Sequence, residues 1–175
     1  MSSWIKAMIL GPLLVTAAWG QKVEEYRVKA AFLLNFAKFV EWPPGSFKAS
    51  ADPIAICVMG QNPFGNALND AVSGKTVDGR TFLVRQLSAA QTASGCQILF
   101  VSSSERKRLP SILDDVKAGG VLTVGEMDNF ASEGGIVNFK IDGGRVCLQV
   151  NVDAAGQARL RISSKLLSLA QIVKR

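Results

Sequence analysis

Apolar positions between residues 25 and 42 recur at the spacing of an α-helix. The segment "EYRVKAAFLLNFAKFVEWP" carries two neighbouring apolar stripes, which predicts a helix that is mostly buried. Its longest uncharged piece, residues 30–37, is too short to cross a bilayer, and Pro43-Pro44 ends the helix. We therefore interpret it as the core helix of a soluble domain. The stripe positions are Tyr26, Ala30, Leu33, Ala37 and Val40, with Phe32, Phe36 and Phe39 beside them.

Beyond Pro44, short apolar runs alternate with helical patterns. Strands are expected over residues 53–60, 81–87, 96–102 and 121–126. A helix is expected over 62–72 with Asn62 as its N-cap, and another over 102–120, which Pro110 breaks or restarts. Residues 135–152 predict two strands joined at Asp142-Gly143-Gly144, which is a strong hairpin signal.

The C-terminal segment, residues 162–175, predicts a closing helix. Its apolar positions recur on one helical face. They are Ile162, Leu166, Leu169 and either Ile172 or Val173. Together the elements predict a three-layer α/β domain: a mostly parallel sheet of about six strands with an antiparallel C-terminal hairpin, flanked by helices.

The N-terminus, "MSSWIKAMILGPLLVTAAWGQ", has the layout of a secretory signal. Lys6 precedes an apolar run, and Ala18 and Gly20 occupy the −3 and −1 positions before Gln21. We expect residues 1–20 to be cleaved and residues 21–175 to form one domain; the alternative is an uncleaved anchor. Export would place the domain in the periplasm.

Composition excludes several functions. The net charge is +6, but the basic residues are scattered, and the one basic run, Arg106-Lys107-Arg108, has no stacking aromatics beside it. We therefore expect no nucleic-acid binding and read that run as a solvated helix face. The chain contains no histidine, which removes the commonest general base and most zinc sites. We expect no enzymatic activity, no metal and no cofactor.

Five ordered segments resemble the YfiR-like family of small periplasmic regulators. They are "RVKAAFLLNFAKFVEWP", "GQNPFG", "GCQILFVSSSE", "GGVLTVGEMDNFASEGGIVNFKIDGGRV" and "LQVNVDAAGQARLRISSKLLSLAQIV". The resemblance implies a non-catalytic protein that binds the periplasmic part of an inner-membrane diguanylate cyclase and holds down cyclic di-GMP synthesis. It also implies that an outer-membrane lipoprotein can sequester the regulator, and that a homodimer forms. The alternative is a periplasmic sensory domain that binds a small molecule.

Three cysteines test this interpretation. In an oxidising compartment at least one pair is expected to bridge, and Cys57 and Cys96 lie in or beside strands that are plausible neighbours; two buried free thiols are the alternative. The family resemblance implies a disulfide at this pair. It also implies a second bridge in the stretch matching "FASEGGIVNF", which has no cysteine here. We expect Cys147, in the last strand, to be a buried free thiol.

Strand-end loops supply the candidate ligand site, because doubly wound folds bind ligands at the carboxyl ends of strands. Serine hydroxyls and free backbone N–H groups before the 102–120 helix could hold an anion, although ordinary helix capping explains the same residues. The candidate ligand-binding residues are Gly60, Ser102, Ser103, Ser104 and Gly125. The carboxylates of Glu126 and Asp128 form an acidic turn that is too small to predict a metal site or acid–base chemistry.

Aromatic residues in loops are the candidate partner-binding residues. Trp42 and Phe47 flank "PPGS", and Phe64 lies in a strand-end loop. Trp42 is the best anchor candidate, and its alternative role is to cap the core beneath the first helix.

Overall fold

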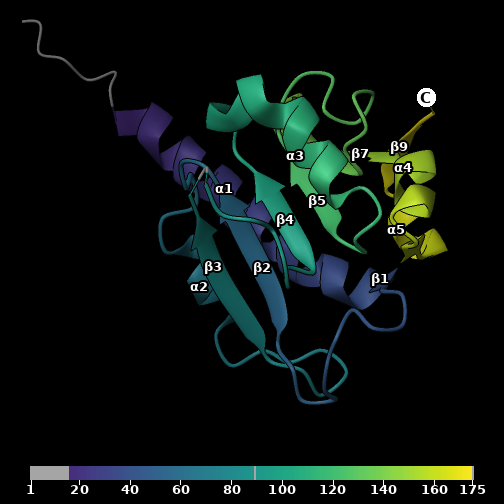
Figure 1. The fold of residues 1–175 in the computed structure, drawn as a ribbon. Coiled ribbons are helices and arrows are strands. Elements are labelled where there is room, and N and C mark those ends of the chain that lie inside the picture. Colours follow the sequence, from purple (N-terminus) through teal and green to yellow (C-terminus); the bar gives the residue numbers. More distant parts are fainter. Residues whose placement is uncertain (1–15, 89, 175) are drawn as a thin grey trace, which may run out of the picture.

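A computed structural model describes residues 16–88 and 90–174 (Figure 1). The long helix α1 (Thr16–Phe39) opens the described chain, and its predicted stripe is buried: Ala30, Leu33 and Phe36 have no exposed surface. The helix ends before Pro43, because Val40–Glu41 leave it to form strand β1. Among the described residues, no helix is both long and apolar enough to cross a membrane.

The sheet has seven strands in the order β3-β2-β4-β5-β6-β7-β9. All neighbouring pairs are parallel except the β6–β7 hairpin. The strands are β2 (Ile54–Met59), β3 (Phe82–Leu87), β4 (Ile98–Val101), β5 (Leu122–Gly125), β6 (Val137–Asp142), β7 (Arg145–Asn151) and β9 (Ala170–Val173). A separate two-stranded ladder joins β1 to β8 (Arg161–Ile162).

Alternate residues of the central strands enter two different cores, one on each face of the sheet. Ile56 of β2 packs with α1 and with α2 (Ala67–Val72), whereas Cys57 packs with α3 (Leu109–Val116). Figure 1 shows α3 in front of the sheet and α1 behind it. The predicted three-layer, mostly parallel α/β fold is therefore confirmed.

Two expected helices differ in detail. The 102–120 segment divides into a 3₁₀ helix, η1 (Ser103–Arg108), and α3, and Pro110 stands in the first turn of α3, where its missing N–H costs nothing. The helix predicted over 62–72 is shorter, because its N-cap is Asn66 and not Asn62. Asn62 instead accepts a hydrogen bond from the backbone N–H of Phe64.

The predicted C-terminal helix over 162–175 is wrong. Only α5 (Ser164–Leu167) is helical, and the chain then forms β9 parallel to β7. Of the expected stripe, Leu166 is 2% exposed but Leu169 is 70% exposed, so the apolar positions do not share one buried face. The β-branched Ile172 and Val173 favour a strand. The hairpin prediction also missed α4 (Val152–Gln157), whose start is capped by Asn151.

The expected cysteine pair forms the disulfide Cys57–Cys96, with a Cα–Cα distance of 5.9 Å, inside the core beneath α3. The sequence separation is 39 residues, and in the chain-entropy model closing such a loop contributes about 4 kcal/mol. Cys147 is a free thiol, but the prediction that it is buried is wrong, because it is exposed. Its neighbours Val146 and Leu148 face the core on the α1 side, so alternation along β7 turns Cys147 toward the other face.

The predicted signal peptide lies largely outside the described residues. Helix α1 begins at Thr16, so cleavage after Gly20 would shorten this helix and leave its buried part intact. Cleavage stays a prediction.

Two glycines, one at the end of β5 and one shortly before β6, make room for one aromatic ring. The Phe130 side chain is fully buried against Gly125 and Gly135. A Cβ atom added at Gly135 would lie 2.1 Å from this ring, and one at Gly125 would lie 2.4 Å from it. Side-chain atoms cannot approach so closely, so both positions need glycine for the space and not for the backbone angle.

Gly135→Ala should therefore destabilise the domain by about 1–3 kcal/mol through overpacking. Gly156→Ala is the matched control: Gly156 lies in α4 with no atom within 4 Å of its added Cβ, and alanine there should be neutral or stabilise by about 0.5–1 kcal/mol. Denaturant unfolding measures both changes. Equal effects of the two substitutions would contradict the packing of Phe130.

Candidate functional site

Three of the five predicted ligand residues lie together where strands β2 and β4 end, and two of them, Gly60 and Ser104, line a cavity there. A Cβ atom at Gly60 would lie 2.4 Å from Ser104 Oγ, and this hydroxyl accepts a hydrogen bond of 2.9 Å from the backbone N–H of Gln61. Ser102 is buried, and its hydroxyl accepts a 3.4 Å hydrogen bond from the N–H of Ser104. The structure thus brings Gly60, Ser102 and Ser104 together, and the two serine hydroxyls already accept hydrogen bonds from backbone N–H groups.

The other two predicted ligand residues lie elsewhere. Gly125 is covered by the ring of Phe130. Ser103 lines a different cavity. A ligand role for these five residues stays a prediction.

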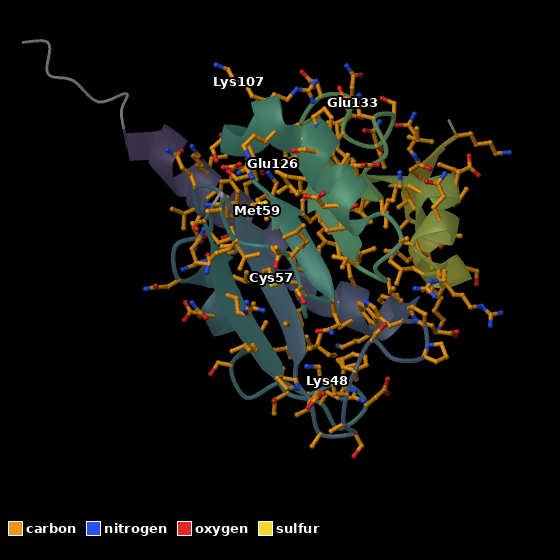
Figure 2. The ribbon with its side chains drawn as sticks, viewed as in Figure 1. Lys48, Cys57, Met59, Lys107, Glu126 and Glu133 are labelled. Carbon is orange, nitrogen blue, oxygen red and sulfur yellow. A yellow bond between two sulfur atoms is a disulfide. The ribbon has the colours of Figure 1, made fainter. Side chains whose placement is uncertain are left out.

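That different cavity, of about 820 Å³, lies where strand β6 outruns strand β5. The two strands pair only at Val124–Val137 and Gly125–Asn138. Beyond Asn138 one side of β6 has no neighbouring strand, and the space is bounded by α1 and the loop after β5. Figure 2 shows Glu126, in that loop, at the same end of the sheet as Met59 and at the opposite end from Lys48.

A buried lysine joins helix α1 to this loop. Lys29 is 3% exposed, and its Nζ donates to Glu126 Oε2 at 2.7 Å and also to Glu25 Oε1. The same ammonium lies 4.6 Å from the ring centroid of Tyr26 and 5.9 Å from that of Phe139. Removing one member of such a buried ion pair typically costs about 3–5 kcal/mol, because an unpaired charge remains. Lys29 therefore fixes the wall of the cavity.

Tyr26 completes the cluster through its hydroxyl, which donates to Glu126 Oε1 at 3.1 Å. Burial raises the pKa of Tyr26 well above its ordinary value, and the neighbouring Glu126 carboxylate raises it further. The phenol therefore stays protonated and acts as a donor at physiological pH.

Asn138, which lines the cavity, has a buried acceptor that is unsatisfied. The residue is 4% exposed, and its Nδ2 donates to Gln149 Oε1 at 3.1 Å; Gln149 in turn donates to Gln171 Oε1 at 3.2 Å. Asn138 Oδ1 has no hydrogen-bond partner among the residues that the structure describes. A buried acceptor left unpaired costs about 1–3 kcal/mol.

The predicted partner-binding aromatics differ in exposure. Trp42 and Phe47 are half-buried and pack edge to face. Trp42 Nε1 donates a hydrogen bond to the backbone carbonyl of Gln97. The Arg80 guanidinium lies over the Phe47 ring, 3.8 Å from its centroid. Phe64 is only 4% exposed and packs against Phe100 in the core, so it cannot be an exposed anchor. Partner binding by Trp42 and Phe47 stays a prediction.

The sequence pattern did not reveal the Lys29–Glu126 pair. In the sequence, Lys29 is only the charge that precedes the uncharged piece 30–37, and Glu126 is only part of an acidic turn. One signal is present in the sequence. Lys29 stands next to Ala30 and three residues after Tyr26, and both of these belong to the apolar stripe, so Lys29 lies beside that stripe on the helix. A lysine at such a position requires a buried partner from elsewhere in the chain. In the described ranges, no group of three or more cysteine and carboxylate side chains is placed to hold a metal ion.

A family model described as YfiR/HmsC-like matches residues 26–171, which is most of the chain. The chain belongs to the YfiR/HmsC-like family. Members of this family are periplasmic regulators of diguanylate cyclases. No curated protein matches the chain.

Two solved structures have a similar fold. One is a conserved domain protein from Vibrio cholerae, with a TM-score of 0.58 and 11% identity over 86% of this chain. The other is an ABC domain from Streptococcus pneumoniae in complex with L-Trp, with a TM-score of 0.55 and 10% identity over 85% of this chain. The match spans 60% of the length of each of these chains. At such low identity, the likeness concerns the fold alone.

The environment of Tyr26 predicts a pH dependence. Because folding raises the pKa of Tyr26, the folded protein holds this proton more tightly than the unfolded chain. The resulting stability is present below about pH 10, the ordinary pKa of tyrosine, and is lost as the pH rises above it.

Tyr26 is the only tyrosine in the chain, so the near-ultraviolet absorbance of tyrosinate reports it directly. We expect the guanidinium-unfolded chain to titrate at about pH 10 and the native protein to remain protonated there. In Glu126→Gln, the native midpoint should move part of the way back, because burial persists when the charge is removed. Identical midpoints in the native and unfolded wild-type protein would contradict the cluster.

Proposed function

We propose that the chain is a periplasmic, non-catalytic binding protein that restrains an inner-membrane diguanylate cyclase. The observation that carries this proposal is the family match over residues 26–171. Two features of the chain support export: the signal-like N-terminus and the Cys57–Cys96 disulfide, which persists in oxidising compartments. The absence of histidine from the sequence favours binding over catalysis.

Restraint would operate by population shift. A regulator that binds the inactive form of the cyclase more tightly than the active form increases the population of the inactive form. Each tenfold difference in affinity contributes about 1.4 kcal/mol to this bias. The regulator needs no bound nucleotide and no chemistry of its own for this effect.

The contact surface that we propose for the cyclase includes Trp42 and Phe47. Half-buried aromatics held by a hydrogen bond and a cation–π contact are pre-ordered, so binding would cost little side-chain entropy. A homodimer and an outer-membrane lipoprotein that sequesters the regulator are further parts of the proposal, and they rest on the family alone.

Deleting the gene should raise cellular cyclic di-GMP several-fold, because the cyclase loses its restraint. Expressing the wild-type chain should restore the low level, which is measured by mass spectrometry of nucleotide extracts. An unchanged level after deletion would contradict the regulation of a cyclase.

The same assay tests the proposed surface. Phe47→Ala should fail to restore the low level of cyclic di-GMP. Leu169→Ala is the control, at a side chain that is 70% exposed and distant in the sequence from Phe47, and it should restore that level. Full restoration by Phe47→Ala would remove this surface from the proposal and leave the regulatory role standing.

A further inference from the structure

A cavity of about 1030 Å³ lies between helix α3 and the strands β2 and β3. Its lining includes Met59 from β2 and the side chains of Ile112 and Val116 from α3. Lys48 lines it as well, and Figure 2 shows Met59 and Lys48 toward opposite ends of the sheet, with Cys57 between them. The cavity therefore runs along the length of β2.

The connection from β3 to β4 explains why this space is open. The two strands lie parallel on either side of β2, so the connection must cross β2. It crosses on the α3 face, because Ala93 and Cys96 belong to the core there. Such crossovers usually contain a helix, but the described residues 90–97 form turns and no helix. Strands β2 and β3 are thus left with an incomplete cover on this face.

Leu83 of β3 is an apolar side chain in the gap. It lines the cavity and is 45% exposed. Its neighbour across the strand pair is Ala55, which belongs to the core beneath α3, so Leu83 lies on the same face of the sheet. Apolar surface that remains open to water gains free energy when the apolar part of a ligand covers it.

Arg85 places a charged group within reach of Leu83. The two residues stand two positions apart on the same face of β3, which separates them by about 7 Å. The Arg85 guanidinium lines the cavity and donates one hydrogen bond of 3.3 Å to the Ser94 carbonyl, and no carboxylate in the described part of the chain pairs with it. A guanidinium is a planar fork of N–H donors that matches the two oxygens of a carboxylate. The remaining donors of Arg85 are therefore suited to an anionic ligand.

The wider charge balance around the cavity is also positive. The lining has three basic and two acidic side chains, which are Lys48, Arg85, Arg108, Asp52 and Asp115. Two neighbours outside the lining cancel each other in this balance: Glu105 pairs with Arg108, and Arg80 donates to the backbone carbonyl of Asp52. Positive charge in a partly enclosed space attracts an anion and repels an ammonium group.

From the incomplete cover, the exposed Leu83 and the guanidinium of Arg85, we propose that this cavity binds a small organic carboxylate with an apolar body. The carboxylate accepts hydrogen bonds from Arg85, and the apolar body lies along Leu83. The volume of about 1030 Å³ is at the upper end of the range of about 300–1,000 Å³ that is usual for small-molecule sites. This inference goes beyond the regulatory role proposed above and does not rest on it.

The test uses three probes of similar shape and different charge: anionic 3-phenylpropanoate, neutral 2-phenylethanol and cationic 2-phenylethylammonium. Acetate is a fourth probe, which has the charge without the apolar body. Isothermal titration of the purified protein should show binding of 3-phenylpropanoate, weaker binding of the alcohol and of acetate by about tenfold or more, and no binding of the ammonium. The proposal is overturned if 3-phenylpropanoate does not bind, if the alcohol or acetate binds equally well, or if the ammonium is preferred.

Arg85→Gln locates the charged end of the site. It should weaken binding of 3-phenylpropanoate by about tenfold or more, because a charge-assisted hydrogen bond is lost. Arg145→Gln is the matched control: it removes the same charge at an exposed arginine of β7 that does not line the cavity. Its affinity for the probe should be unchanged. Undiminished binding by Arg85→Gln, or an equal loss in both variants, would contradict the assignment.

Leu83→Ala locates the apolar end. It should weaken binding of 3-phenylpropanoate by about threefold or more, because the phenyl ring loses apolar contact. Ile141→Ala is its control, since Ile141 is 46% exposed, much as Leu83 is, but lines only the cavity beside β6. Equal affinities of these two variants for the probe would count against the proposed position of the ring.

A measurement on the unmodified protein keeps the proposal falsifiable if Arg85→Gln does not fold. The side-chain Nε–H resonance of Arg85, in ¹⁵N-labelled wild-type protein, should shift on titration with 3-phenylpropanoate. It should not shift with 2-phenylethylammonium at the same concentration. A resonance that stays in place under 3-phenylpropanoate would overturn the proposal.

Discussion

Burial of one face of helix α1 against the sheet is the interaction on which the rest of the structure depends. Leu33 and Phe36 have no exposed surface and pack on strands that are far away in the sequence. Each such side chain contributes about 1.5–3 kcal/mol. The middle of the same helix forms a wall of the cavity beside β6, and its end passes directly into β1, which pairs with β8.

Lys29 shows how a core element can also shape a site. It stands beside Ala30 in the buried face, yet its ammonium reaches the loop after β5 and pairs with Glu126. The ion pair fixes the distance between α1 and this loop, and so it defines the opening beside β6. The cavity therefore depends on the same helix placement that the core enforces, and a change in the seating of α1 would alter both.

The features that could be predicted from the sequence are those that local periodicity decides. The buried stripe of α1, the alternation of strands with helices and the Asp142-Gly143-Gly144 hairpin all follow from spacing within short windows. Periodicity failed for Leu169 and Ile172, which share a helical face in the sequence but lie in a turn and an edge strand. There, pairing with β7 overrides the local pattern. The Lys29–Glu126 pair and the orphaned Asn138 join residues from distant parts of the chain, and no local pattern encodes such contacts.

The buried face of α1 describes a domain whose first long helix is a structural part of its core. Native-state hydrogen exchange of the backbone amides of residues 30–37 tests this claim most directly. The account predicts that these amides exchange only through global unfolding, with the same free energy as those of β4 at the centre of the sheet. Exchange of residues 30–37 through a local opening of much lower free energy, while β4 stays protected, would contradict it.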